Sequence, residues 1–311
     1  GYNAFLTCRE CGEAVLCPRC SVSLTRHKES GRDYLLCHYC GYRAAIPHEC
    51  PSCHSAHLAF MGYGTQKVEE AFGEKFGGAY HASLLRMDAD TTTKKSAYDE
   101  LLGKFRAHRA DVLLGTQMVA KGHDFPDVTL VGVLNADAAL YLDDFRAGER
   151  TFSMLTQVIG RAGRAAKRGV AVIQTMNPNH EVIRLAAAQD YRAFYARDIK
   201  LREAFTFPPF CEIAVISAAS ASEAACTKCA AEVFTFMKDK MSGDYRDVPV
   251  ISFGPFEAPL YKIEDCYRMR VVLKCRRSKR LLAMLGELLR HFTTKDYKAV
   301  SVGVDINPTN L

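Results

Sequence analysis

Eight of the thirteen cysteines lie between residues 8 and 53, in four C-x-x-C pairs. The two sulfurs of such a pair can reach one metal ion at tetrahedral angles, and a structural zinc site takes four ligands. Eight thiolates therefore saturate two zinc ions and leave no coordination position open for a catalytic water. We expect two structural zinc sites within residues 1–60. The four pairs are Cys8/Cys11, Cys17/Cys20, Cys37/Cys40 and Cys50/Cys53.

Four pairs can be combined into two sites in three ways. Residues 21–36 separate the inner pairs, which is the spacing of a zinc ribbon. Alternating apolar residues on either side of a polar turn at 29–32 predict a hairpin there. We therefore favour a nested arrangement, and the side-by-side pairings and disulfides remain alternatives. Zinc site 1 would contain Cys8, Cys11, Cys50 and Cys53, and zinc site 2 would contain Cys17, Cys20, Cys37 and Cys40.

Composition places the chain among globular proteins. It has 311 residues, of which 48% are hydrophobic and 24% charged, so wholesale disorder is excluded. No apolar run approaches the roughly 18–20 residues that span a bilayer, and residues 1–6 do not resemble a signal peptide. We expect a cytoplasmic protein without a membrane partner, in a compartment that keeps its thiols reduced.

Residues 61–205 alternate between apolar runs and amphipathic stretches. The runs at 83–87, 111–114, 128–134 and 170–174 predict strands, 93–108 predicts an amphipathic helix, and 181–205 predicts one long helix. This alternation is typical of an α/β domain with a mostly parallel sheet. Ligands bind at the carboxyl ends of the strands in such sheets.

The segment 157–164, with the sequence QVIGRAGR, is the sharpest motif of the chain. On a helix, Gln157, Arg161 and Arg164 would project from one face, because they stand at i, i+4 and i+7. Two guanidinium groups on one stripe suit the charge that develops on a transferring phosphoryl group. The alternative is a solvated basic helix.

Several motifs together resemble the superfamily 2 helicases and, within them, the PriA family of replication-restart helicases. The resemblance covers essentially the whole chain, and the combination with four upstream C-x-x-C pairs is specific. The motifs are RMDADTT at 86–92, GTQMVAKGHDFP at 115–126, DAAL at 137–140, DFR at 144–146 and QVIGRAGR at 157–164.

The resemblance implies an α/β second RecA-like helicase lobe at 61–205, with the zinc module at 1–60 inserted into it. Arg161 and Arg164 would face the ATP γ-phosphate, with Gln157 nearby. Gly122 and Asp124 would belong to the nucleotide-sensing end of their motif. ATP and Mg²⁺ would be cofactors of the full-length protein, and the two zinc ions would belong to this chain.

The same resemblance implies nucleic-acid contacts and partners. Thr116 and Gln117 would lie toward the track of single-stranded DNA. The implied partners are single-stranded and forked DNA, the single-stranded-DNA-binding protein, other primosome proteins and the loader of the replicative helicase. The implied location is the cytoplasm of a bacterium, in association with the nucleoid.

One helicase motif is missing from the chain. No G-x-x-x-x-G-K-[ST] phosphate loop occurs in the 311 residues, and in this family that loop belongs to the first lobe. We therefore expect part of an ATP-dependent 3′→5′ DNA helicase that initiates primosome assembly, inactive when isolated. The alternative is a non-enzymatic zinc-ribbon DNA-binding or scaffold protein with a vestigial helicase lobe. A third possibility is another helicase, similar to reverse gyrase, with a zinc insert.

Residues 206–311 predict a separate domain after the boundary at 207–210. Their order of expected elements is β-α-β-β-α-β, a ferredoxin-like α+β pattern that is similar to the S10-type domain of the family. The chain's net charge is only +6, yet residues 262–298 hold eleven Lys/Arg and four Asp/Glu. We expect a DNA- or acidic-peptide-binding cluster at a helix start, with a solvated face as the alternative. The cluster is Arg276, Arg277, Lys279 and Arg280.

Overall fold

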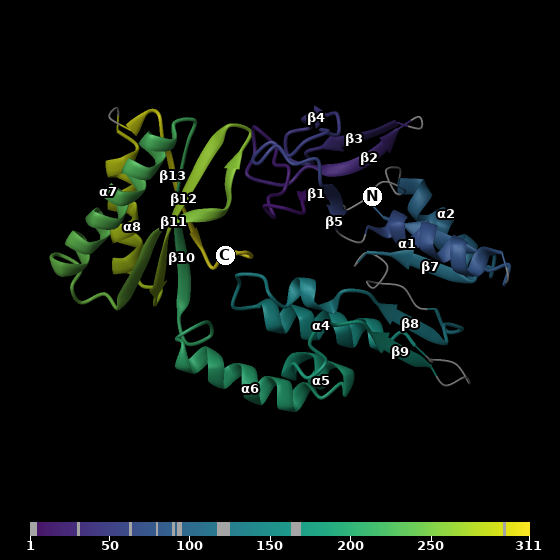
Figure 1. Ribbon diagram of the computed structural model, residues 1–311. Helices are drawn as coiled ribbons and strands as arrows, with labels where there is room; N and C mark the ends of the chain where they lie inside the picture. The colour runs from purple at the N-terminus through teal and green to yellow at the C-terminus, as the bar shows by residue number, and fades with distance from the viewer. Residues whose placement is uncertain are drawn as a thin grey trace. The chain divides into compact units, whose positions relative to one another are not determined.

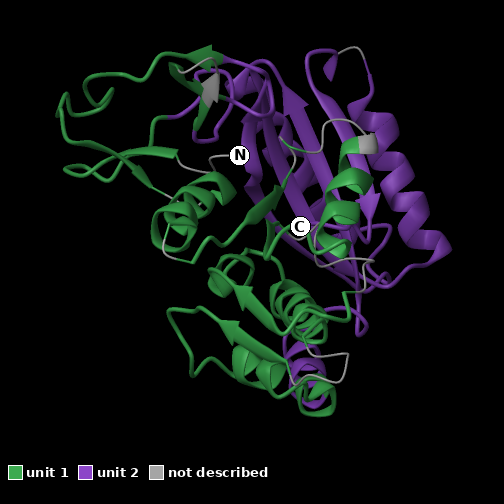
Figure 2. Cartoon of the chain, turned by 90° about the vertical axis from the view of Figure 1, so that its right-hand side faces the viewer, with its two compact units in different colours: residues 1–15, 24–36, 43–195 green, residues 16–23, 37–42, 196–311 purple. Residues whose placement is uncertain are grey.

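The computed structural model describes residues 5–29, 32–61, 64–78, 80–88, 91, 95–116, 125–162, 169–294 and 297–311 (Figure 1). The chain divides into two compact units (Figure 2). Unit 1 contains residues 1–15, 24–36 and 43–195, and unit 2 contains residues 16–23, 37–42 and 196–311. Two short loops of the cysteine-rich segment thus group with the C-terminal residues in unit 2.

The cysteine-rich segment contributes an antiparallel sheet to unit 1, with the strand order β4-β3-β2-β1-β5. The expected hairpin is present, since β2 and β3 pair from Thr25↔Leu36 to Glu29↔Arg32. Leu6, Leu24 and Leu35 are fully buried and hold the sheet to the loops around it. The strands are β1 Phe5–Cys8, β2 Thr25–Glu29, β3 Arg32–Leu36, β4 Arg43–Ala44 and β5 Leu58–Met61.

The rest of unit 1 is an α/β lobe whose described strands pair in parallel, as the sequence predicts. Strand β6 pairs with β7, and β8 pairs with β9. Within the described residues these are two separate two-stranded sheets rather than one continuous sheet. The strands are β6 Leu84–Met87, β7 Val112–Gly115, β8 Leu130–Val133 and β9 Val170–Ile173.

Helices and short turns connect these strands. They are α1 Thr65–Phe72, a π-helical turn η1 at Gly73–Gly77, α2 Lys95–Arg106, a 3₁₀ turn η2 at Ala136–Ala139, α4 Ala147–Ile159, α5 Glu181–Ala187 and α6 Tyr191–Ala204. The core of the lobe forms around α4, where Leu155 is fully buried and Phe152 stacks on Phe194 with ring centroids 4.2 Å apart. This packing fixes the helix that carries Gln157.

The single long helix expected over 181–205 is wrong. Gln189 has a φ of 54°, a left-handed conformation that no continuous helix contains. The Asp190 carboxylate then accepts a hydrogen bond from the N–H of Ala193 at 2.9 Å, which caps the start of α6. A local turn and a cap therefore divide the stretch into α5 and α6.

The C-terminal part of unit 2 has the predicted β-α-β-β-α-β order. Its antiparallel sheet has the strand order β11-β12-β10-β13, which is the ferredoxin-like arrangement, and α7 and α8 pack on it (Figure 1). Ser222 and Ser278 cap the two helices through their Oγ atoms. The elements are β10 Glu212–Ser220, α7 Glu223–Ser242, β11 Val250–Ile263, β12 Cys266–Cys275, α8 Lys279–Phe292 and β13 Ser301–Ile306.

The core of this sheet and its two helices is apolar and closely packed. Met237 of α7, Leu273 of β12 and Leu288 of α8 are completely buried. Cys226 and Cys229 also face this core, so they pack as apolar side chains. Among the described residues, none of the helices has the length and apolar character needed to cross a membrane.

Candidate functional site

Two groups of four cysteines bring their sulfur atoms together, and they correspond to the nested arrangement. In unit 1, the Sγ atoms of Cys8 and Cys53 lie 3.5 Å apart, and those of Cys11 and Cys50 lie 3.7 Å apart. In unit 2, Cys17 Sγ lies 3.6 Å from Cys40 Sγ, and Cys20 and Cys37 complete the group. All four sulfurs of each group lie within 4.8 Å of one another.

These distances fit tetrahedral zinc and exclude disulfides. Zinc–sulfur bonds of roughly 2.3 Å at tetrahedral angles place two sulfurs about 3.8 Å apart, whereas a disulfide joins its sulfurs at about 2 Å. Four sulfurs per group fill the coordination shell. The two groups are therefore four-cysteine zinc-binding sites of the structural kind, with two zinc ions per chain.

The turns of the C-x-x-C pairs hold the sulfurs in place. In each pair the N–H of the first cysteine donates to a carbonyl five residues later, as Cys8 does to Glu13 and Cys50 to Ser55. Backbone N–H groups of Cys53 and Ser52 lower the pKa of the Cys50 thiol to about 6. These donors favour the thiolate at Cys50, the form that binds metal, whereas burial and the neighbouring sulfurs raise the pKa of Cys11 and Cys53 in the same group.

The α/β lobe carries the residues that the family resemblance assigned to nucleotide. Gln157 is exposed near the end of α4. Arg161 lies just beyond the helix, and its N–H donates to the Val158 carbonyl at 3.0 Å. The other members of that set lie outside the described residues. These are Arg164, Gly122, Asp124 and, from the expected DNA contacts, Gln117.

The helical stripe expected over 157–164 is wrong at its second member. Helix α4 ends at Ile159, and Gly160 is its C-cap. The N–H groups of Arg161 and Ala162 bond three residues back, to Val158 and Ile159, so the last turn tightens. Glycine is a poor helix former and commonly ends helices. Gln157 and Arg161 therefore do not lie one helical turn apart on a continuous helix.

The start of α4 is anchored by the carboxylate of Asp144, which the sequence offered only as part of the DFR motif and without a role. The Asp144 side chain is only 6% exposed, and it accepts a hydrogen bond from the Arg146 N–H at 2.8 Å. Arg150, one turn into the helix, places its Nη1 atom 3.3 Å from the same carboxylate. The sequence clue was an aspartate three residues before the first helical residue, where helix caps occur.

Polar residues also follow the lobe's strands. Thr116 is exposed directly after β7. Asp137, after β8, is buried and accepts hydrogen bonds from Thr175 Oγ1 and the Met176 N–H, both at 2.8 Å. The Met176 N–H lowers the pKa of Asp137. Asp137 therefore ties the carboxyl end of β8 to that of β9.

The basic cluster at the start of α8 is not uniform. All four residues are exposed, and they differ in their partners. Arg280 reaches toward the loop after α7, where its Nη2 atom donates to the Asp244 carbonyl at 2.5 Å and to Asp247 Oδ1 at 2.9 Å. Three of the four side chains therefore present charge without a structural role of this kind.

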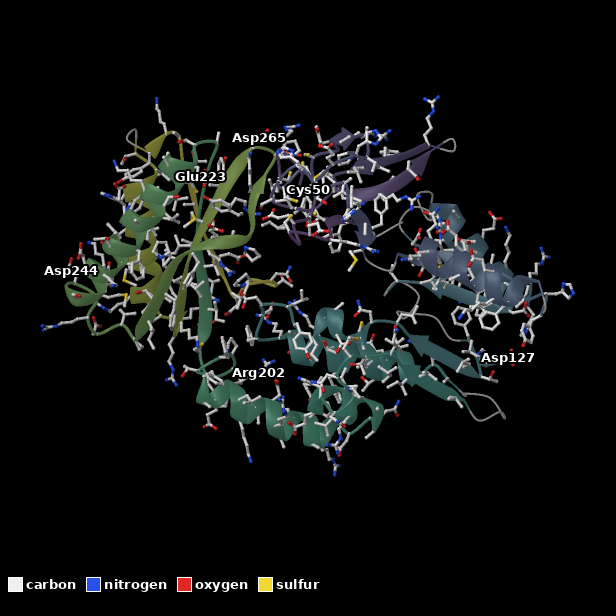
Figure 3. All side chains as sticks on the ribbon, in the orientation of Figure 1. Cys50, Asp127, Arg202, Glu223, Asp244 and Asp265 are labelled. Carbon is white, nitrogen blue, oxygen red and sulfur yellow. The ribbon has the colours of Figure 1, made fainter. Side chains whose placement is uncertain are left out.

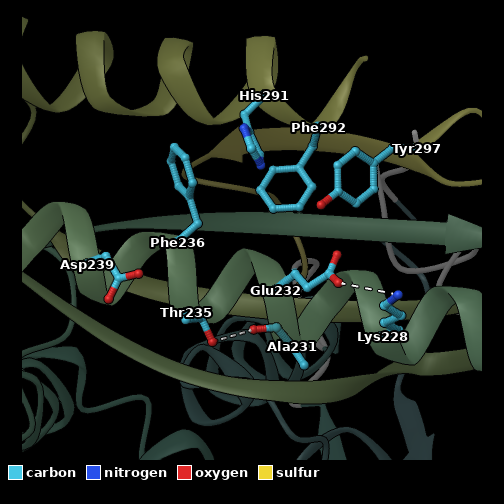
Figure 4. A pocket seen from close by; sticks show the side chains of 9 residues that line it. All are labelled: Lys228, Ala231, Glu232, Thr235, Phe236, Asp239, His291, Phe292 and Tyr297. Carbon is cyan, nitrogen blue, oxygen red and sulfur yellow. Dashed lines mark hydrogen bonds and ion pairs between the residues drawn. The ribbon is translucent and has the colours of Figure 1, made fainter. Parts of the chain in front are cut away.

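An open pocket of about 420 Å³ lies between α7 and α8 (Figure 4). Its aromatic lining consists of Phe236, His291, Phe292 and Tyr297. Lys228 and Glu232 at its edge form an ion pair with each other at 3.8 Å, and Asp239 also lines it. The pocket belongs to unit 2, whereas Gln157 and Arg161 belong to unit 1.

Comparisons with known proteins match most of the chain. Three family models apply: the PriA DNA helicase Cys-rich region domain at residues 17–44, the helicase conserved C-terminal domain at 60–166 and the primosomal protein N C-terminal domain at 203–309. Among solved structures, the C-terminal domain of the DEAD-box protein Dbp5 aligns over 42% of this chain and 64% of the Dbp5 chain. The alignment has a TM-score of 0.29 and 20% sequence identity. That likeness is too weak to support an argument about the fold.

Curated relatives named replication restart protein PriA align along nearly all of the chain. The Bacillus subtilis protein is 41% identical over 309 residues, which is 99% of this chain and 37% of the relative. The Haemophilus influenzae protein is 35% identical over 311 residues, which is 100% of this chain and 41% of the relative. The chain thus spans about two fifths of these relatives' length. With three family models in the same order along it, the chain belongs to the PriA family of replication restart proteins.

Proposed function

We propose that this chain is the C-terminal portion of a cytoplasmic, ATP-dependent 3′→5′ DNA helicase that acts at stalled replication forks. The observation that carries the proposal is the match of residues 60–166 to the helicase conserved C-terminal domain, directly between two segments that match PriA-specific families. The matched region contains Thr116, Gln157 and Arg161. A zinc-binding scaffold would not require these three segments in one chain.

In the proposed mechanism, Arg161 and Arg164 contact the γ-phosphate of ATP held by another lobe. A guanidinium presents several N–H donors in a fixed fork and stays charged. It therefore stabilises the negative charge on the γ-phosphoryl oxygens while the bond to the leaving group breaks. The Asp144–Arg150 pair and the buried Leu155 support this role, because they hold α4 rigidly just before Arg161. Gln157, Gly122 and Asp124 would contact nucleotide from the same lobe.

The chain supplies only part of this reaction. Its 311 residues contain no phosphate loop, so ATP and Mg²⁺ would be held mainly by a partner lobe of the complete protein. The isolated chain would therefore neither hydrolyse ATP nor unwind DNA. Its own cofactors would be the two structural zinc ions.

Contacts with DNA would come from two places on the chain. Thr116 and Gln117 follow β7, where a nucleic-acid backbone would bind in a parallel α/β lobe. Arg276, Arg277 and Lys279 add exposed positive charge in unit 2. The proposed protein partners are the single-stranded-DNA-binding protein, primosome proteins and the loader of the replicative helicase.

The test compares ATP turnover and unwinding by the complete protein that carries this segment. Arg161→Ala and Arg164→Ala should each lower kcat by roughly 10³-fold, the scale of an arginine finger, while zinc content and DNA affinity stay unchanged. Arg184→Ala, an exposed arginine on α5, is the matched control and should keep full activity. Unchanged turnover in the Arg161/Arg164 double variant, or DNA binding without any ATP turnover by the complete protein, would overturn the proposal.

A further inference from the structure

The turn of the β11–β12 hairpin lies against zinc site 2. Both belong to unit 2, and the hairpin tip is formed by residues 262–265. The N–H of Ser21 donates to the Lys262 carbonyl at 2.8 Å, and the Lys262 N–H donates to Ser21 Oγ at 2.8 Å. The Asp265 N–H donates to the Arg19 carbonyl at 2.9 Å. Three backbone N–H groups thus join segments that are more than 240 residues apart.

The Cys17–Cys20 turn differs from the other three C-x-x-C turns in its last backbone hydrogen bond. In those three, the residue after the second cysteine has a positive φ and bonds back to the first cysteine. Thus Gly12, Gly41 and His54 donate to the carbonyls of Cys8, Cys37 and Cys50 at 3.1, 2.9 and 3.0 Å. At the equivalent position, Ser21 donates to Lys262 instead.

The same turn also differs in the donor to its second sulfur. In the other three turns, the backbone N–H two residues after the second cysteine, that of Glu13, Tyr42 or Ser55, interacts with the sulfur of Cys11, Cys40 or Cys53. The sulfur of Cys20 accepts from the N–H of Glu264 at 3.3 Å. The hairpin tip therefore takes the place of a donor that the other turns supply locally.

The backbone conformation of the hairpin tip also indicates that the tip is held by the Cys17–Cys20 turn. Glu264 and Asp265 form a two-residue loop between the paired residues Ile263 and Cys266, and their φ values are 50° and 62°. Asparagine and glycine are the usual residues in such a loop, because left-handed backbone is unfavourable for other side chains. Strained backbone persists where surrounding contacts require it. Here the N–H groups of both strained residues, Glu264 and Asp265, donate to the Cys17–Cys20 turn.

Side chains reinforce the contact. Arg19 Nε lies 2.8 Å from Asp265 Oδ2, and Lys262 Nζ lies 3.2 Å from Asp265 Oδ1. Lys262 Nζ also donates to the Pro18 carbonyl at 3.1 Å. Asp265 is labelled at the end of the hairpin in Figure 3. These groups are partly exposed, so they add orientation more than binding energy.

We propose that the hairpin tip is the outer shell of zinc site 2, so that zinc binding there and docking of the β11–β12 hairpin stabilise each other. A hydrogen bond from outside the ligand set orients a thiolate and offsets part of its negative charge, and such groups change metal affinity substantially. The coupling is reciprocal by thermodynamic necessity. In zinc site 1, the N–H groups that interact with the second cysteines, Cys11 and Cys53, come from the same turns.

The first test measures metal release from the two sites. In chains where one site is disabled, by Cys11→Ser with Cys53→Ser or by Cys37→Ser with Cys40→Ser, the remaining site reports alone. The Arg19→Ala, Ser21→Ala and Lys262→Ala triple variant should lose zinc from site 2 to a chelator roughly ten- to a hundred-fold faster, with site 1 unchanged.

Glu10→Ala with His57→Ala removes the side-chain pair beside site 1 and is the matched control, which should leave site 2 unchanged. Equal release from site 2 with and without the triple change would overturn the proposal.

The second test observes the hairpin itself and does not depend on the triple variant folding normally. Cadmium-113 in site 2 of the nitrogen-15-labelled chain should show coupling to the Glu264 amide proton through the Cys20 sulfur. Disabling site 2 should raise hydrogen exchange at the Glu264 and Asp265 amides, whereas disabling site 1 should not. Amide protection that ignores the loss of metal from site 2 would show that the hairpin docks independently.

Discussion

Arg280 and Asp247 face each other as a two-pronged pair: Nε lies 2.9 Å from Oδ2, and Nη2 lies 2.9 Å from Oδ1. The guanidinium also stands over the Tyr245 ring, 5.2 Å from its centroid. Planar, bidentate recognition of a carboxylate is the geometry that arginine suits best. The pair joins the start of α8 to the loop after α7, so one member of the basic cluster has an intramolecular partner.

The cluster should therefore respond unequally to alanine substitution. Replacing Arg276, Arg277 and Lys279 together should weaken binding of single-stranded DNA and reduce its dependence on salt concentration, because each phosphate contact releases a counterion. Arg280→Ala should change DNA affinity much less and lower thermal stability slightly. DNA titrations at several salt concentrations measure the affinity and its salt dependence, and thermal unfolding measures the stability. If Arg280→Ala alone weakened DNA binding as much as the triple change, the division of roles would be wrong.

A second ion pair, between α7 and α8, predicts a pH dependence. Lys240 Nζ lies 2.6 Å from Glu287 Oε2, and the Tyr245 hydroxyl donates to Glu287 Oε1 at 2.5 Å. Lys240 first, and Tyr245 second, lower the pKa of Glu287. A carboxyl whose pKa is lower in the folded state stabilises that state above its unfolded pKa, about 4.3. The contribution is lost as the pH falls through the lowered, folded value.

Glu287→Gln should therefore lower the free energy of unfolding at pH 7 and flatten its fall in acid. The variant and the parent chain should converge only once the pH has fallen below the lowered pKa of folded Glu287, where both side chains are neutral. Denaturant unfolding at a series of pH values gives the comparison. Glu232→Gln is the control, because its partner Lys228 is exposed and 3.8 Å away. A difference between parent and Glu287→Gln that grows toward low pH would have the wrong sign for this account.

Short-range patterns in the sequence predict much of this structure. Alternation around a polar turn predicts the β2–β3 hairpin, and the ribbon spacing of the inner pairs favours the nested cysteine groups over the other pairings, which the sequence left open. Hydrophobic periodicity predicts the β-α-β-β-α-β order of the C-terminal residues, where apolar faces are long and regular. The burial of Cys226 and Cys229 follows from their i, i+3 spacing on one helix face.

The failures share a different physical cause. The end of α4 at Gly160 and the break at Gln189 depend on single backbone conformations within otherwise helical sequences. The bond from the Glu264 N–H to Cys20 joins residues 244 positions apart, and nothing in the local pattern around either residue indicates the other as its partner. The partner of Arg280 is likewise set by tertiary packing. Periodicity describes faces, whereas these features depend on where two distant backbones meet.

Zinc content should separate the two cysteine groups. The purified chain should hold two zinc ions, and Cys11→Ser with Cys53→Ser should reduce this to one, because two remaining thiolates are a poor tetrahedral site. Cys37→Ser with Cys40→Ser should also leave one ion. Cys211→Ala, a buried cysteine outside both groups, should keep two. Elemental analysis of the dialysed proteins provides the measurement. Cys11 and Cys17 belong to different sites in the nested arrangement but to one site in a side-by-side pairing. Loss of only one ion from the Cys11→Ser with Cys17→Ser variant would therefore indicate the side-by-side pairing.

Asp137 provides a test of how the helicase-type lobe holds its strand ends together. Asp137→Ala would leave the Thr175 hydroxyl and the Met176 N–H without their buried acceptor, which should destabilise the lobe by about 1–3 kcal/mol. Hydrogen exchange at the Met176 amide should rise before that of unit 2 changes. Asp137→Asn retains one acceptor oxygen but turns an NH₂ group toward one of the two donors, so it should fall between the parent and Asp137→Ala.

The pH dependence gives the same residue a second, independent signature. Because backbone and hydroxyl donors lower the pKa of Asp137, the parent lobe should lose this contribution as the pH falls below the unfolded value of about 3.9, and the Asp137→Asn lobe should not. Asp127→Asn is the control, since that exposed carboxylate lies 3.4 Å from His108 and bonds to no strand end. Equal stability of parent and Asp137→Ala at neutral pH would mean that the backbone pairing of β8 with β9 is enough to join the two strands. The Asp137 carboxylate would then not be needed for this purpose.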